Sequence, residues 1–199
     1  VSFVAKDTNN VQINFDLPRK KTDPLLSAEE AKSIQALIEN TSLNISSISQ
    51  RPVKTKPKPP FITSTLQQAA STRLGFNVKR TMRVAQKLYE NGYITYMRTD
   101  APSLSKESIQ DARAFIGDDL GSSYLTNAPR IYSSQENAQE AHEAIRPTSA
   151  SRKPGMITSS SDEEQRLYEL IWQQFISSQM PDAEYLSTSA KVNLEGYEF

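Results

Sequence analysis

The chain has 199 residues and no cysteine, and its 23 basic residues balance its 23 acidic ones. Disulfides and thiolate metal sites are therefore excluded, and no apolar run approaches the roughly eighteen residues that a membrane helix needs. The sequence opens on an apolar-alternating stretch without the features of a secretory signal. We therefore expect a cytoplasmic protein with no membrane partner, with room for one ordinary domain or one domain and part of another.

The N-terminal third carries strand signals on both sides of one helix. Apolar residues alternate over 1–17 around a polar centre, which predicts a β-hairpin. Residues 27–30 match a capping box, which starts a helix that is expected to end near Asn40. A further strand is predicted over 43–53. The proline-rich stretch 56–60 cannot be helical and is expected to connect two lobes in an extended form.

Two helices joined by a short turn are predicted next. Ser64 and Gln67 match a second capping box for a helix over 64–74, and Gly75 is placed to end it. The second helix is predicted over 78–90. Its apolar face is expected to consist of Val78, Met82, Ala85 and Leu88 or Tyr89. Such a pair of helices resembles a helix-turn-helix.

The remaining sequence predicts a short strand, two more helices and a closing strand. The run 93–97 is β-branched and aromatic, as is typical of strands. Ser105 is placed to cap a helix that stops at Gly117, and a third capping box at 161–164 starts the longest helix. From Tyr185 onward the pattern is again that of a strand.

Strand-rich ends around a helical middle indicate an α+β fold in which a helical domain is inserted into a β-domain. We place residues 1–58 and 183–199 in the β-domain and residues 59–182 in the helical one. Two unrelated lobes in tandem are the alternative.

Positive charge is segregated along the chain although the net charge is zero. Nine basic residues and no acidic one lie between Arg51 and Tyr89. A neutral protein with one basic surface can focus a positive potential on a polyanion. The pattern favours a nucleic-acid partner, although lysines on a solvated linker and helix face would produce the same composition.

Tyr96 and Arg98 form a candidate reaction centre, because residues two apart in a strand face the same side. A phenol with a pKa near 10 is about one part in a thousand ionised at pH 7, a cost of roughly 4 kcal/mol. A nearby guanidinium stabilises the phenolate and can hold a phosphate oxygen. These are two needs of phosphoryl transfer. For so short a motif, a surface tyrosine and arginine that merely stack are the alternative.

Longer stretches resemble bacterial DNA topoisomerase I, of the type IA family. The run 92–100, Gly-Tyr-Ile-Thr-Tyr-Met-Arg-Thr-Asp, is similar to the family's active-tyrosine segment. Residues 60–69, 138–148 and 180–183 resemble further family segments in the same order. Met97 favours the topoisomerase I branch, because the topoisomerase III branch typically has proline there.

The resemblance implies a role for each matched residue. Tyr96 is expected to be the nucleophile and Arg98 to assist at the scissile phosphate. Tyr93 and Tyr89 are the competing tyrosines, and Tyr89 is expected in the core because it falls on the apolar face of its helix.

His142 is the only histidine, and it resembles the family histidine that supports DNA binding near the cleavage site. Arg146 stands where a zinc-protease pattern needs its second histidine, so no metal site is expected here. Hydroxyls and amides at a helix start, and nearby cations, can hold phosphates. The residues expected to contact DNA are therefore His142, Thr63, Ser64, Thr65, Arg73, Lys79, Arg80 and Arg146.

The resemblance also implies a fold and a reaction. The helical domain is expected to be winged-helix-like (catabolite-activator-like) and inserted in part of a β-arch that helps enclose DNA. One DNA strand would be cut through a 5′-phosphotyrosyl bond and resealed without ATP, which relaxes negative supercoils. Magnesium would be bound by a Toprim domain that is absent from these residues, so a central fragment of this kind is expected to be inactive alone.

The expected partners are DNA, single-stranded at the cleavage site, and the remaining domains of the same polypeptide, in association with the nucleoid. A non-catalytic single-stranded DNA-binding module of the same fold is the first alternative. A tyrosine recombinase, which would link to the 3′ end, is the second.

Overall fold

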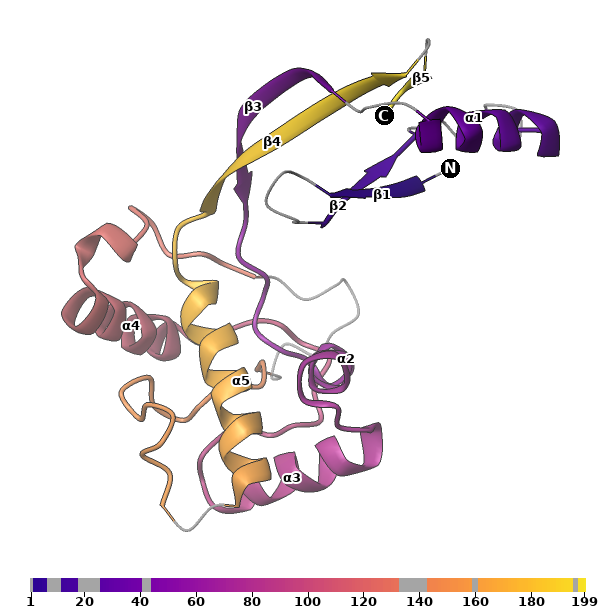
Figure 1. Cartoon of the computed structure of the whole chain (residues 1–199). Helices are drawn as coiled ribbons and strands as arrows, with labels where there is room; N and C mark the ends of the chain where they lie inside the picture. Colours follow the sequence, from indigo (N-terminus) through magenta and orange to yellow (C-terminus); the bar gives the residue numbers. More distant parts are fainter. Residues whose placement is uncertain are drawn as a thin grey trace. The chain divides into compact units, whose positions relative to one another are not determined.

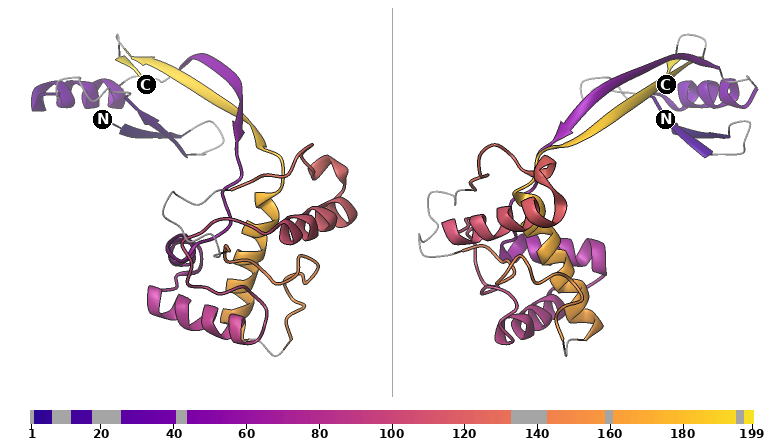
Figure 2. Two further views of the ribbon diagram at one scale, coloured as in Figure 1. Left: turned by 180° about the vertical axis from the view of Figure 1, so that it is seen from behind. Right: turned by 90° about the vertical axis from the view of Figure 1, so that its left-hand side faces the viewer.

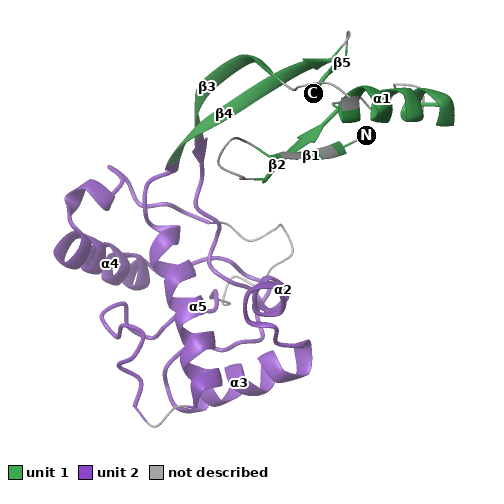
Figure 3. Cartoon of the chain, viewed as in Figure 1, with its two compact units in different colours: residues 1–53, 184–199 green, residues 54–183 purple. Residues whose placement is uncertain are grey.

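The computed structural model describes residues 2–6, 12–17, 26–40, 44–132, 143–158, 161–194 and 197–199. The chain divides into two compact units, one of residues 1–53 and 184–199 and one of residues 54–183 (Figure 3). No helix in the described part of the chain is long and apolar enough to cross a membrane. In chain order (Figure 1) the elements are β1 (Ser2–Lys6), β2 (Gln12–Asp16), α1 (Ala28–Asn40), β3 (Ile45–Thr55), α2 (Thr63–Leu74), α3 (Val78–Glu90), α4 (Lys106–Phe115), η1 (Ile116–Leu120), η2 (Ser122–Tyr124), α5 (Asp162–Ser178), β4 (Ala183–Leu194) and β5 (Tyr197–Glu198).

The first unit contains two small sheets. β1 and β2 pair antiparallel with Ser2 opposite Asp16, so the predicted hairpin is confirmed. The second sheet has the order β3-β4-β5, and β3 and β4 run in opposite directions (Figure 1). The Ser46 hydroxyl on β3 donates to the Lys191 carbonyl on β4 at 3.0 Å.

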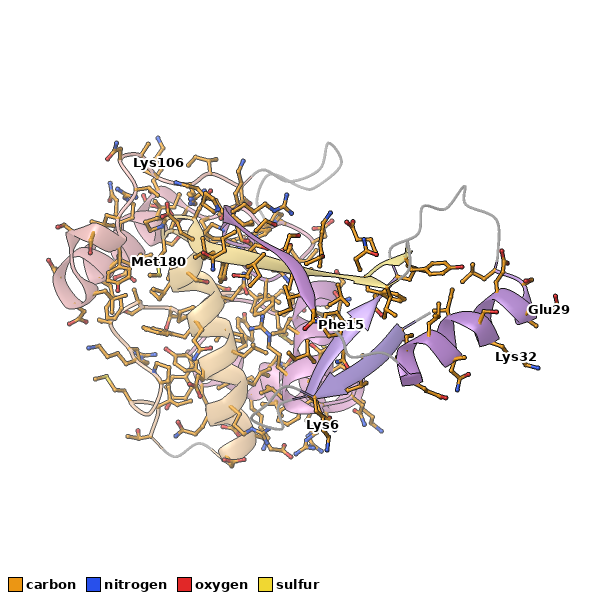
Figure 4. All side chains as sticks on the ribbon, turned by 45° about the horizontal axis from the view of Figure 1, so that its top comes forward. Lys6, Phe15, Glu29, Lys32, Lys106 and Met180 are labelled. Atoms are coloured by element: carbon orange, nitrogen blue, oxygen red, sulfur yellow. The ribbon has the colours of Figure 1, made fainter. Side chains whose placement is uncertain are left out.

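The helix of the first unit begins at the predicted capping box. The Ser27 amide donates to the Glu30 carboxylate at 2.7 Å, and the Glu30 amide donates to Ser27 Oγ at 3.1 Å. Glu29 and Lys32 project from the exposed side of α1 (Figure 4). Ile34 is buried on the opposite side, where the apolar cluster of this unit consists of Phe15, Ile34, Val192, Leu194 and Phe199.

The second unit is organised around α5, which packs against α2, α3 and α4 (Figure 2). Leu167, Ile171 and Phe175 of α5 are fully buried. Ser161 caps the helix as predicted, because its hydroxyl accepts from the Glu164 amide at 3.4 Å. A helix with apolar residues on most of its sides is stable only when other elements cover it, so α5 is the central element of this unit.

The turn between α2 and α3 forms as predicted. Gly75 has a φ of 69°, the left-handed conformation that glycine adopts without a steric penalty. The Asn77 side chain caps α3 by accepting from the Arg80 amide at 2.8 Å. The predicted bounds of α3 are confirmed, and the two helices are held in a fixed geometry on the core.

The predicted start of α2 is wrong. The helix begins at Thr63, and the Ile62 amide donates to Thr65 Oγ1 at 3.0 Å. Ser64 and Gln67 therefore do not form its capping box. The helix starts one residue earlier because Thr63 is itself bound to the chain segment that contains Tyr96, as described below.

The predicted strand over 93–97 is also wrong. This segment is irregular, and its one backbone bridge joins Ile94 to Pro147. Proline has no amide to donate, so a ladder cannot continue past it. The predicted stop at Gly117 is wrong as well, because α4 continues as the π-helical turn η1 and the chain leaves the helix at Gly121.

Candidate active site

Tyr96 and Arg98 lie in the irregular segment between α3 and α4, and both are exposed to solvent. The Tyr96 side chain is 48% exposed, whereas the neighbouring Met97 is 1% exposed and Thr99 is 8% exposed. Buried and exposed side chains alternate here without a sheet, because Met97 and Thr99 anchor the segment in the unit. Tyr96 and Arg98 therefore lie on the surface of this unit.

Hydrogen bonds hold the Tyr96 segment from one side through Thr95. The Thr95 amide donates to the Arg146 carbonyl at 2.9 Å, and the Thr95 hydroxyl donates to the Ala144 carbonyl at 2.7 Å. The Arg146 amide in turn donates to Thr95 Oγ1 at 3.0 Å. The backbone immediately before Tyr96 is thus fixed to a segment fifty residues later in the chain.

The start of α2 holds the segment from the other side through Thr63. The Thr63 hydroxyl contacts the Met97 carbonyl at 2.9 Å and accepts from the Thr99 amide at 2.9 Å. The Thr63 amide donates to the Thr99 carbonyl at 2.9 Å. Thr63 was predicted to contact DNA, but its part-buried hydroxyl is bound to the backbone of residues 97 and 99. Thr65 is exposed, and its hydroxyl accepts from the Ile62 amide at 3.0 Å. Both hydroxyls position the backbone in this structure.

A surface cavity of about 490 Å³, wide open to solvent, lies where this segment meets the first turn of α2. It is lined by Ile62, Thr63, Ser64, Gln67, Arg98, Thr99 and Asp100. The Thr63 amide is already bound to the Thr99 carbonyl, but the first turn of a helix as a whole carries partial positive charge, which favours anions. The Arg98 guanidinium and Ser64 share the cavity with that helix start and favour a phosphate group, whereas the Asp100 side chain in the same lining opposes an anion.

Of the three candidate tyrosines, Tyr93 is committed to a structural role. Its hydroxyl donates to the Thr158 carbonyl at 3.0 Å, and its ring packs edge-on against Tyr168. The Tyr96 hydroxyl makes no hydrogen bond to a described residue. The expectation that Tyr89 lies in the core is wrong: it is 41% exposed, and its ring contacts that of Tyr96.

The basic face of α3 is paired with acidic residues at the start of α5. Arg80 and Arg83 contact the Glu163 carboxylate at 2.6 and 3.1 Å, and Lys87 lies 3.6 Å from Glu164. The hydrogen bond from Arg80 is the main reason that the pKa of Glu163 is below its ordinary value of 4.5. The positive charge that is segregated in the sequence is therefore partly neutralised in the fold.

The other cations predicted to bind DNA differ in their surroundings. Arg73 and Lys79 are exposed and make no ion pair with a described residue. Arg146 is only 14% exposed and binds the Glu143 carboxylate at 2.8 and 2.9 Å. His142 lies outside the described residues. Arg73 and Lys79 are thus the two predicted DNA contacts whose charges are accessible in this structure.

Glu143 joins the start of α4 to Arg146, a structural role that the sequence did not predict. Its carboxylate accepts from the Ser105 amide at 2.9 Å and the Ser108 hydroxyl at 3.0 Å, in addition to Arg146. Burial raises the pKa of Glu143, but these hydrogen bonds and the Arg146 charge outweigh burial and leave the pKa below 4.5. The opposite charges of Glu143 and Arg146, three residues apart, were the available signal, although the segment is not helical.

Comparison with known proteins identifies the family. A family model described as DNA topoisomerase matches residues 2–199, and the chain therefore belongs to the DNA topoisomerase family. It is 47% identical over 196 residues to DNA topoisomerase 1 of Pseudomonas aeruginosa, covering 98% of this chain and 22% of that protein. It is 47% identical over 167 residues to DNA topoisomerase 1 of Escherichia coli, covering 84% of this chain and 19% of that protein.

The solved structures agree with this family. The structure of full-length topoisomerase I from Thermotoga maritima is similar to this chain, with a TM-score of 0.71 and 33% sequence identity. The match covers 100% of this chain and 32% of the Thermotoga maritima chain. The similarity is thus to bacterial topoisomerase I, a type IA enzyme, and the resemblance seen in the sequence is confirmed. The chain spans about a fifth of the length of these two relatives, since it covers 22% of the Pseudomonas aeruginosa protein and 19% of the Escherichia coli protein.

Proposed function

We propose that this chain carries the nucleophile of a type IA topoisomerase and that the nucleophile is Tyr96. The Tyr96 oxygen attacks a DNA phosphorus, a new O–P bond forms, and the bond from phosphorus to the 3′-oxygen breaks. The phenolic proton leaves Tyr96, and the departing 3′-oxygen takes up a proton to become a free hydroxyl. Rejoining is the reverse reaction, so the cycle needs no ATP and can relax negative supercoils between the two steps.

The observation that carries this proposal is an exposed phenol two residues before an arginine that lines a surface cavity. Tyr96 is half-exposed and its hydroxyl has no hydrogen bond to a described residue, while Arg98 two residues later lines the cavity at the start of α2. Electrostatic stabilisation by groups already in place is a large term in phosphoryl transfer. Arg98 stabilises the phenolate and the charge on the phosphate, and the α2 start holds a DNA phosphate next to it.

Magnesium is proposed to act from a separate acidic domain of the Toprim type. Among the described residues, no group of three or more His, Asp or Glu side chains is placed to hold a metal ion. The described residues therefore do not fit a magnesium site. We propose that the 199 residues alone neither cleave nor relax DNA, and that the complete enzyme acts with its other domains in the nucleoid. Relaxation of a supercoiled plasmid by the purified chain would contradict this.

The proposed substrate is DNA that is single-stranded at the cleavage site. The exposed Arg73 and Lys79 on the helical unit, which we propose to be winged-helix-like, are candidates for phosphate contacts. His142 is proposed to support binding near the cleavage site. Binding should weaken as salt is raised, because each phosphate contact releases counterions.

Replacing Tyr96 by phenylalanine in the complete enzyme tests the proposal. The Tyr96→Phe variant should bind a single-stranded oligonucleotide with unchanged affinity but form no covalent complex, since the attacking oxygen is absent. Tyr93→Phe is the matched control, because it removes one hydroxyl three residues away and should still form the complex. End-labelled DNA should show protein on the 5′ end. Covalent complex in Tyr96→Phe, or protein on the 3′ end, would refute the assignment.

A further inference from the structure

The backbone around Tyr96 is fixed, but the backbone alone does not fix the direction of its side chain. An exposed aromatic residue can occupy several χ1 rotamers. Only a rotamer that points the phenolic oxygen at the scissile phosphorus is reactive. Some neighbour must therefore select that rotamer, or the time spent in unreactive rotamers lowers the rate of attack.

Tyr89 is the neighbour that contacts this ring. The two ring centroids are 5.2 Å apart with an interplanar angle of 63°, the edge-to-face arrangement in which the positive edge of one ring meets the negative face of the other. Among the described residues, Tyr89 is the aromatic residue whose ring contacts the Tyr96 ring. The contact is not needed to fill the core, because Tyr89 itself is 41% exposed.

The backbone of Tyr89 is in turn fixed by its helix, which also restricts the side chain to two χ1 rotamers. It lies in the last turn of α3, next to the fully buried Leu88. The chain then turns back at Gly92, whose φ is 70° and whose amide donates to the Tyr89 carbonyl at 2.9 Å. The Tyr93 amide donates to the Leu88 carbonyl at 2.9 Å. This tight turn returns the chain so that Tyr96 meets the side of Tyr89.

We propose that Tyr89 is a positioning residue, whose ring holds the Tyr96 ring in the orientation from which the Tyr96 oxygen attacks DNA. The inference rests on the proposed role of Tyr96 as the nucleophile. The contact involves rings and not hydroxyls, so phenylalanine at position 89 should serve as well as tyrosine. An aliphatic side chain should not.

The test compares Tyr89→Leu and Tyr89→Phe in the complete enzyme, by the single-turnover rate of covalent-complex formation on a single-stranded oligonucleotide. At saturating DNA, Tyr89→Leu should be slower by about three- to tenfold, the range expected for loss of an aromatic pair. Tyr89→Phe should restore the rate to within about twofold of the wild type. The dissociation constant for DNA should be unchanged in both variants.

Tyr124→Leu is the matched control, because Tyr124 is 49% exposed and makes no ring contact with a described residue. An unchanged cleavage rate in Tyr89→Leu would overturn the proposal, as would an equal loss in Tyr89→Phe or a loss that disappears once DNA saturates the enzyme. Tyr96→Phe run in parallel separates the two hypotheses. If that variant still forms covalent complex, the proposed function itself fails, whatever the Tyr89 variants do.

Discussion

Replacing Thr63 by valine removes one hydroxyl from the contact between α2 and the Tyr96 segment and leaves the shape of the side chain nearly unchanged. The Thr99 amide, which donates to that hydroxyl at 2.9 Å, loses its acceptor. The Met97 and Thr99 carbonyls, at 2.9 and 3.0 Å, lose the one hydroxyl proton that is available to them. Thr99 is 8% exposed, so water replaces the lost partner poorly. A buried polar group left without a partner costs about 1–3 kcal/mol, and we expect a loss of about 2 kcal/mol in unfolding free energy.

The control for this variant is Thr72→Val on the same helix. The Thr72 hydroxyl is exposed and donates at 3.0 Å to the Gln68 carbonyl, one turn earlier. Both substitutions replace threonine by valine on α2, but the Thr72 hydroxyl is exposed and water can replace its bond, so Thr72→Val should cost less than about 0.5 kcal/mol.

Urea unfolding of the 199-residue chain measures both variants. Trp172 is the only tryptophan and lies on α5, with its indole N–H donating to the Ala150 carbonyl at 2.8 Å, so its fluorescence reports on the helical unit. In the complete enzyme, Thr63→Val should also slow covalent-complex formation, because Met97 follows Tyr96 directly. Equal stability losses in Thr63→Val and Thr72→Val would refute the assignment of Thr63 as the anchor of the site.

Two further predictions concern stability. Glu143→Gln should destabilise the chain at pH 7. The folded-state pKa of Glu143 is below its ordinary value of 4.5. The stability that its carboxylate contributes is therefore complete above pH 4.5 and is lost as the pH falls through the folded-state pKa. The free-energy gap between wild type and variant, measured by urea unfolding from pH 7 to pH 3, should therefore narrow; a constant gap would contradict it. Gly75→Ala should lower the free energy of unfolding by about 1 kcal/mol, because alanine is strained at a φ of 69°. The cost comes from the backbone alone, since nothing lies within 4 Å of the added carbon. An unchanged thermal midpoint would contradict this prediction.

Features that depend on neighbours within one turn could be predicted from the sequence. The capping residues Ser27, Ser105 and Ser161 bind amides three residues ahead, and each does so in the structure. The alternation of 1–17 predicted a hairpin because its two strands lie next to each other in the chain. The family, too, was recognisable from ordered local segments that the comparisons confirm.

Features that depend on distant residues could not be predicted in this way. The irregular conformation of 93–97 follows from pairing with Pro147, fifty residues later, and the start of α2 follows from the bonds between Thr63 and Thr99. The ion pair between Arg80 and Glu163 partly neutralises a cation that was predicted to contact DNA. No pattern in the sequence links these two residues.

The sequence by itself determined the family, the identity of the candidate nucleophile Tyr96 with its neighbour Arg98, and most helix ends, because each of these is encoded in short contiguous stretches. Only the tertiary structure decided which tyrosine hydroxyls are engaged, which cations are accessible, and that the ring of Tyr89 contacts that of Tyr96. Burial, ion pairing and ring contacts are set by side chains that meet only after the chain has folded. Their energies depend on distance in space, which spacing along the chain does not give.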